Sequence, residues 1–126
     1  MATIQQKILI VEDEADTAEM LAEMVRISGY QPECTYSGKN AIHMLTSLKP
    51  DLVLLDIVMP GISGLDVLNF MRTDPRLIGI PVIIISSNSM PSDKQTCLEA
   101  GANEYLTKPV SYTDLKDAIE KAFQSR

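Results

Sequence analysis

The residues of this chain that can carry chemistry stand directly after its short apolar segments. Three acids, one hydroxyl and one lysine occupy such positions: Glu12 and Asp13 after residues 7–11, Asp56 after 52–55, Ser86 after 82–85 and Lys108 after 104–107. If the segments are parallel strands, their carboxyl ends meet at one edge of a sheet. We therefore expect these five side chains to converge.

Side chains of these types suggest a phosphoryl-transfer site. Carboxylates brought close together raise one another's pKa, and their fully ionised state costs free energy unless a cation neutralises them. The ligands on offer are all oxygens, which favours Mg²⁺, with Mn²⁺ as an alternative. With the metal on one phosphoryl oxygen and the Lys108 ammonium on another, Asp56 is placed to attack phosphorus and form an aspartyl phosphate.

The acids also have a purely structural interpretation. Glu12, Asp13 and Glu14 would suit the first turn of a helix, whose dipole favours negative charge. Asp56 is harder to explain in this way, because it follows four apolar residues and has no positive partner nearby in the sequence. A structural role would leave its charge at the edge of the core without a reason. The set as a whole therefore favours a functional site.

The apolar patterns predict the elements that must position these residues. Three continuous, mostly β-branched runs predict buried strands at 7–11, 52–55 and 82–85, and two weaker strands are expected at 33–36 and 104–107. Apolar residues at helical spacing predict helices over 18–25, 41–48 and 115–123, with shorter ones at 65–72 and near 93–100. Five strands alternating with five helices predict a three-layer α/β/α sandwich around a parallel sheet.

Length and composition set further limits. A chain of 126 residues with 45% hydrophobic content is the size of one soluble domain. Its net charge of -6, with no basic run, argues against sequence-independent nucleic-acid binding. No apolar run is long enough for a membrane helix or a signal peptide, so a cytoplasmic location is expected. Cys34 and Cys97 are expected to be reduced, and His43 to lie on a helix surface rather than to donate phosphate.

Four motifs occur in a defined order along the chain: ILIVEDE at 8–14, DLVLLDIVMPGISG at 51–64, IPVIIIS at 80–86 and GANEYLTKP at 101–109. Together they resemble the receiver domain of two-component response regulators, and the resemblance covers essentially the whole chain. It implies a five-stranded parallel sheet of flavodoxin-like topology. It also implies that residues 1–126 form a single receiver domain, with no effector domain among them.

The resemblance assigns roles at the acidic edge. Asp56 is the expected phosphoacceptor, and Asp13 a direct Mg²⁺ ligand. Glu12 is expected to bind the metal through water, and the backbone carbonyl of Val58 to supply a further ligand. Lys108 is expected to pair with the phosphoryl oxygens.

Further roles concern the switch that phosphorylation operates. Ser86 is expected to move its hydroxyl onto the phosphoryl group, and the ring of Tyr105 to turn inward in response. Pro109 is expected to follow a cis peptide bond that aims Lys108 into the site. Gly61 and Gly64 would bend the loop beyond Asp56.

The same resemblance implies the partners. A sensor histidine kinase or a histidine phosphotransfer protein would supply the phosphoryl group. A downstream protein or a second copy of the chain would bind the face formed by the helix near 93–100, strand 104–107 and the last helix, which carries charges of both signs. Neither nucleic acid nor a membrane is an expected partner of this domain.

Two other interpretations remain open. A phosphatase of the haloacid-dehalogenase type also passes through an aspartyl phosphate, but it would need a second Asp two residues after the nucleophile to protonate the leaving group. Val58 occupies that position, so a regulatory phosphoacceptor is favoured over an enzyme. A binding module whose site is no longer used is the third interpretation, and the complete set of acids, hydroxyl and lysine argues against it.

Overall fold

A computed structural model describes residues 5–125 of the chain. Strands and helices alternate in the order β1 (Lys7–Val11), α1 (Ala15–Ile27), β2 (Gln31–Thr35), α2 (Gly38–Leu48), β3 (Leu52–Asp56), α3 (Gly64–Thr73), β4 (Val82–Ser86), α4 (Pro91–Glu99), β5 (Glu104–Thr107) and α5 (Tyr112–Gln124).

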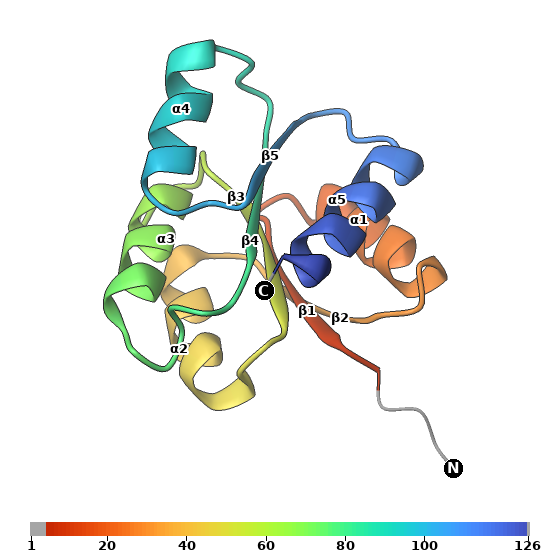
Figure 1. Ribbon diagram of the computed structural model, residues 1–126, viewed down its shortest axis with the longest axis horizontal. Coiled ribbons are helices and arrows are strands. Elements are labelled where there is room, and N and C mark those ends of the chain that lie inside the picture. Colours follow the sequence, from red (N-terminus) through yellow and green to blue (C-terminus); the bar gives the residue numbers. More distant parts are fainter. Residues whose placement is uncertain (1–4, 126) are drawn as a thin grey trace.

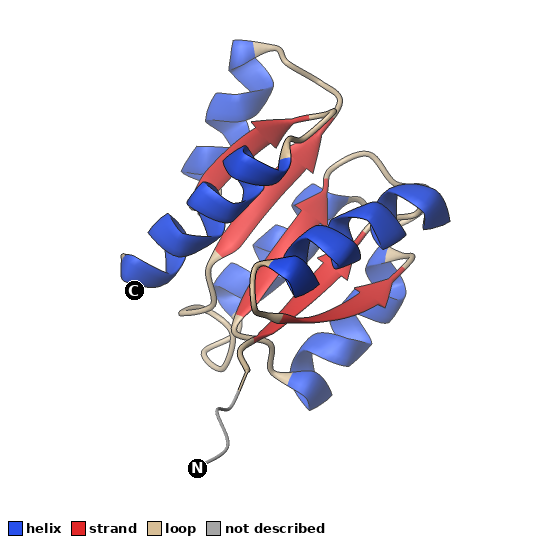
Figure 2. Cartoon of the chain, turned by 90° about the vertical axis from the view of Figure 1, so that its right-hand side faces the viewer, coloured by secondary structure: helices blue, strands red, loops and turns tan. Residues whose placement is uncertain are grey.

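The five strands form one parallel sheet in the order β2-β1-β3-β4-β5. Helices α1 and α5 cover one face of this sheet, whereas α2, α3 and α4 cover the other (Figure 1, Figure 2). The predicted three-layer sandwich with flavodoxin-like topology is confirmed. None of the helices in residues 5–125 is both long and apolar enough to cross a membrane.

The core lies in two parts, one on each side of the sheet. Because successive side chains of a strand point to opposite faces, Ile8 and Ile10 pack toward α1 and α5, while Leu9 and Val11 pack toward the other three helices. Strands β3 and β4 are buried along their whole length. Each fully buried aliphatic side chain contributes roughly 1.5–3 kcal/mol, so the central strands form a rigid base for whatever follows their carboxyl ends.

Boundaries differ from the predictions at the sheet edge and at the helix starts. Strand β2 runs over Gln31–Thr35 rather than 33–36, and it includes Pro32, which an edge strand tolerates because one side of it needs no ladder hydrogen bonds. The helices begin up to one turn before their apolar stripes, and at α2, α3 and α5 a serine side chain caps this first turn. The hydroxyl of Ser37, for example, accepts a hydrogen bond from Asn40 N at 3.1 Å.

Candidate functional site

The acidic residues and the lysine meet at the carboxyl edge of the sheet, as the sequence predicts. Glu12 follows β1, Asp56 is the last residue of β3, and Lys108 follows β5. Their side chains form one cluster, in which Lys108 Nζ lies 2.6 Å from Glu12 Oε1 and 3.5 Å from Asp56 Oδ2. Glu12 is 1% exposed and Asp56 is 6% exposed. Two buried carboxylates therefore share one ammonium group.

Burial and this imbalance of charge together shift the pKa of all three groups. Burial, followed by the negative charge of Glu12, raises the pKa of Asp56 to about 6. Burial would also raise the pKa of Glu12, but hydrogen bonds from the Lys108 ammonium and the Glu14 amide hold that pKa below its usual value. Burial would lower the pKa of Lys108, but its hydrogen bond to Glu12 and the negative charges of Asp56 and Glu12 together outweigh burial and keep the pKa above its ordinary value. Asp56 is thus the acid that gains most from an additional cation.

A third acid completes a group with the dimensions of a metal site. Glu12, Asp13 and Asp56 each offer one carboxylate oxygen, and these oxygens lie within 4.8 Å of one another. Asp13 is exposed, whereas the other two acids are buried. The amide of Val58 donates to Asp56 Oδ1 at 3.2 Å, which places this residue beside the group. A donor set made of oxygens alone suits Mg²⁺, and the excess negative charge gives the ion a reason to bind.

The loop from β3 to α3 closes tightly over the backbone of Asp56. Gly64 N donates to Ile57 O at 3.0 Å, and a Cβ atom at Gly64 would collide with the carbonyl oxygen of Asp56. Gly61, in the same loop, has a φ of 75°, a region that favours glycine. The two glycines therefore let the loop return to the sheet edge and keep Val58 near the acids.

On the other side of Asp56, the loop from β4 to α4 ties Ser86 to Tyr105. Ser86 is fully buried, and its Oγ accepts a hydrogen bond from Asn88 N at 3.1 Å. The ring of Tyr105 is buried as well, and its hydroxyl donates to Asn88 O at 2.6 Å. The ring of Tyr105 therefore lies inward in this structure. Asn88 connects the two residues.

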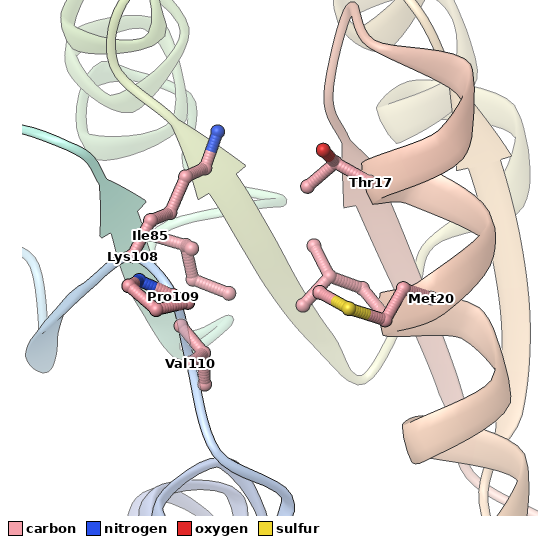
Figure 3. A pocket seen from close by; sticks show the side chains of 7 residues that line it. Thr17, Met20, Ile85, Lys108, Pro109 and Val110 are labelled. Carbon is pink, nitrogen blue, oxygen red and sulfur yellow. The ribbon is translucent and has the colours of Figure 1, made fainter.

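A small cleft opens beside Lys108, between α1 and the segment that follows β5. Its volume is about 250 Å³, and Figure 3 shows Thr17 and Met20 of α1 on one side facing Lys108, Pro109 and Val110 on the other. The peptide bond between Lys108 and Pro109 is cis. Apart from Thr17 and the lysine, the labelled side chains are apolar. The acidic site therefore adjoins an apolar hollow.

Two contacts near the site were not predicted from the sequence. One is that of Asn88, although a short polar residue between a strand and a proline-initiated helix is a recognisable turn signal. Arg72 left no signal at all, because its partners are chiefly backbone carbonyls from separate loops. His43 lies exposed on α2, as predicted, and Cys34 and Cys97 are free thiols.

Comparisons with known proteins agree with this geometry. The model of the response regulator receiver domain family matches residues 8–120. The DNA-binding response regulator MtrA of Mycobacterium tuberculosis is 36% identical over 115 residues, which are 91% of this chain and 49% of MtrA. The chain thus spans about half the length of the curated relatives it matches.

Solved structures give the same result. A protein described as a response regulator from Chloroflexus aurantiacus superimposes with a TM-score of 0.92 at 30% identity, covering 96% of this chain and 99% of that one. The receiver domain of a signal transduction histidine kinase from Syntrophus aciditrophicus gives a TM-score of 0.87 at 33% identity, with coverage of 95% and 91%. With the acidic edge, the lysine and the family match in agreement, this chain belongs to the response regulator receiver domain family.

Proposed function

We propose that this receiver domain accepts a phosphoryl group on Asp56 with the help of Mg²⁺. The observation that carries the proposal is the sharing of the single Lys108 ammonium by Glu12 and Asp56, with Lys108 Nζ 2.6 Å from Glu12 and 3.5 Å from Asp56. This arrangement leaves a buried carboxylate under-neutralised at the mouth of a site. Such a carboxylate is both a nucleophile and a metal ligand.

In the proposed reaction, a carboxylate oxygen of Asp56 attacks the phosphorus atom of a phosphohistidine. A P–O bond forms as the P–N bond breaks, and the electron pair returns to the imidazole nitrogen, which then takes up a proton. Glu12, Asp13 and Asp56 would hold the Mg²⁺, with the Val58 carbonyl as a further ligand. The metal neutralises charge that builds up on the phosphoryl oxygens.

Lys108 and Ser86 would act on the phosphoryl group directly. The Lys108 ammonium lies 2.6 Å from Glu12 and 3.5 Å from Asp56, so it would be within reach of a phosphoryl oxygen carried by Asp56. The Ser86 hydroxyl is an acceptor in its contact with Asn88, which leaves its own hydrogen available for donation to another phosphoryl oxygen.

The partner that supplies the phosphoryl group would dock beside this site. A histidine on the surface of a kinase or phosphotransfer protein must approach Asp56 closely, and the apolar cleft between α1 and Val110 adjoins the lysine (Figure 3). Met20, at its rim, is 43% exposed. We propose that a helix of the phosphohistidine protein covers this cleft. Met20→Lys should then slow transfer from such a protein and leave the reaction with acetyl phosphate unchanged.

The output would leave from the face made of α4, β5 and α5, toward a downstream protein or a second copy of the chain. This face carries both signs of charge, and Lys121 lies 3.9 Å from Glu104 within it. Exposed pairs of this kind are weak and salt-sensitive. A partner that binds one state of the domain better would therefore meet a surface that can rearrange at little cost.

Intact-mass measurement after incubation with acetyl phosphate and Mg²⁺ tests the proposed function. We expect one added phosphoryl group per chain, lost in Asp56→Asn and on chelation of Mg²⁺, and retained in Asp117→Asn, a control on the exposed face of α5. Asp13→Ala should weaken the metal dependence more than Glu12→Ala. Repeated turnover of a phosphate ester would favour a phosphatase, and the absence of any added mass would favour a module whose site is unused.

A further inference from the structure

Helix α4 is held to the domain by very little apolar surface. Of its nine residues, Cys97 is the one that is buried, whereas the other four helices each bury three or four. Leu98 is 39% exposed, and Met90, which precedes the helix, is 58% exposed. Since burial of an apolar stripe is what normally fixes a helix on a sheet, the position of α4 must depend on contacts at its two ends.

At the carboxyl end of α4, the contact is made by Arg72. Its guanidinium donates to the carbonyl oxygen of Gly101 through Nε at 3.0 Å and through Nη2 at 2.9 Å, and the same side chain binds the carbonyl of Ile80 at 2.9 Å. Gly101 has a φ of 109°. This end of α4 is therefore fixed to α3 and to the start of β4.

At the amino end of α4, both the oxygen and the nitrogen of the Asn88 side chain form hydrogen bonds. The Oδ1 atom of Asn88 accepts from Met90 N at 2.9 Å, and its Nδ2 donates to Asp93 Oδ2, in the first turn of α4, at 2.7 Å. The backbone of the same residue holds Ser86 Oγ through its N–H and the Tyr105 hydroxyl through its carbonyl. One residue thus contacts both switch residues and the helix.

We propose that Asn88 is a positioning residue that makes α4 and Tyr105 follow the hydroxyl of Ser86, with its bond to Asp93 as the link to the helix. The proposal rests on the proposed function, in which Ser86 moves toward a phosphoryl group on Asp56. A displacement of the Ser86 hydroxyl shifts the backbone of Asn88, because the Asn88 amide is hydrogen-bonded to it. Its carbonyl then moves the Tyr105 hydroxyl, and its side chain moves the first turn of α4 while Arg72 fixes the other end.

The experiment measures hydrogen exchange of the α4 amides, with and without acetyl phosphate and Mg²⁺, while intact mass reports the phosphoryl group. Asn88→Ala removes the side-chain contacts and keeps both backbone contacts. Asp93→Ala removes the same link from the other side, and Asp93→Asn keeps an oxygen acceptor. Ser92→Ala, which changes an exposed side chain next to Asp93, is the matched control.

Without a phosphodonor, we expect Asn88→Ala and Asp93→Ala each to speed exchange in the first turn of α4 by about tenfold, as the loss of a hydrogen bond to a charged acceptor implies. In the double variant, exchange in the first turn of α4 should be no faster than in the faster of the two single variants. With the donor, both variants should gain the phosphoryl group at the parent rate but lose the phosphorylation-dependent change in α4. Asp93→Asn and Ser92→Ala should respond like the parent.

Two results would overturn the proposal. One is an α4 that responds to phosphorylation in Asn88→Ala as it does in the parent. The other is a pair of single variants whose effects on exchange simply add in the double variant, since Asn88 and Asp93 would then act independently. If the parent gains no phosphoryl group, the proposed function fails, and the exchange measured without donor still decides whether the Asn88–Asp93 contact anchors α4.

Discussion

The two ends of the sheet differ in how well their buried or half-buried charged groups are supplied with partners. At the amino end, Arg72 uses all five of its N–H donors on oxygens of Ile78, Ile80, Gly101 and Asn103. At the carboxyl end, Glu12 and Asp56 share one ammonium, and the pKa of Asp56 rises to about 6 through burial and the charge of Glu12. A group whose partners are all supplied by the fold stabilises the fold. A group short of a partner can bind a ligand.

The largest expected effect is a loss of stability when the hydrogen bonds of Arg72 at the amino end of the sheet are removed. Arg72→Met would leave the carbonyls of Gly101 and Ile80 without their donors, and we expect it to lower the free energy of unfolding by about 3 kcal/mol in urea denaturation. Arg76→Met is the matched control, because the exposed side chain of Arg76 pairs with its near neighbour Asp74, and it should cost less than about 1 kcal/mol. Equal losses of unfolding free energy in the two variants would mean that the hydrogen bonds of Arg72 do not stabilise the amino end of the sheet.

The next prediction tests the under-neutralised end. Lys108→Met should slow phosphorylation by acetyl phosphate by about 100-fold at saturating Mg²⁺, because one donor to the phosphoryl oxygens is lost. Lys121→Met removes an exposed lysine of α5 and should react at the parent rate. Stopped-flow or quenched mass measurements give both rates. A Lys108 variant that reacts as fast as the parent would remove Lys108 from the reaction.

These two variants also mark what could be predicted from the sequence. The site residues follow buried strands, and strand position is a local property of apolar runs, so the convergence of Glu12, Asp56 and Lys108 was predictable. The hydrogen bonds of Arg72 depend on carbonyls of loops far apart in the chain, and no local sequence pattern encodes them. The buried position of Tyr105 likewise depends on the Asn88 carbonyl, a contact that only the folded loop creates.

A smaller effect concerns pH. Since the pKa of Asp56 is raised to about 6 in the folded protein, the folded state holds a proton that the unfolded state has already released, so stability falls as pH rises from about 4 through about 6. Urea denaturation in EDTA should show this fall in the parent and in Asp117→Asn, and a flatter profile in Asp56→Asn. The lowered pKa of Glu12 acts with the opposite sign and at lower pH. Identical profiles for the parent and Asp56→Asn would contradict the crowding of the two acids.

The smallest effect sharpens the chemistry of the carboxyl end. Val58 is 66% exposed, and its side chain cannot form a hydrogen bond with an attacking water. The side-chain amide of Asn88 is already hydrogen-bonded to Asp93 and to the backbone of Met90. We therefore expect the phosphoaspartate to hydrolyse more slowly in the parent than in Val58→Asn, by a severalfold factor seen in the decay of the added mass. Ile78→Asn, an exposed apolar residue at the other end of the sheet, should decay like the parent. Decay in the parent that equals or exceeds that of Val58→Asn would refute this account.

The most direct test of the central claim locates the phosphoryl group in the sequence. The parent chain is incubated with acetyl phosphate and Mg²⁺, treated with borohydride to reduce the acyl phosphate, and digested for peptide sequencing by mass spectrometry. The predicted result is a single reduced residue at position 56, which disappears when Mg²⁺ is chelated. Reduction at Asp13 or Glu12 in place of Asp56, or a phosphoryl group that forms equally well without a divalent cation, would contradict the assignment of Asp56 as the metal-dependent acceptor.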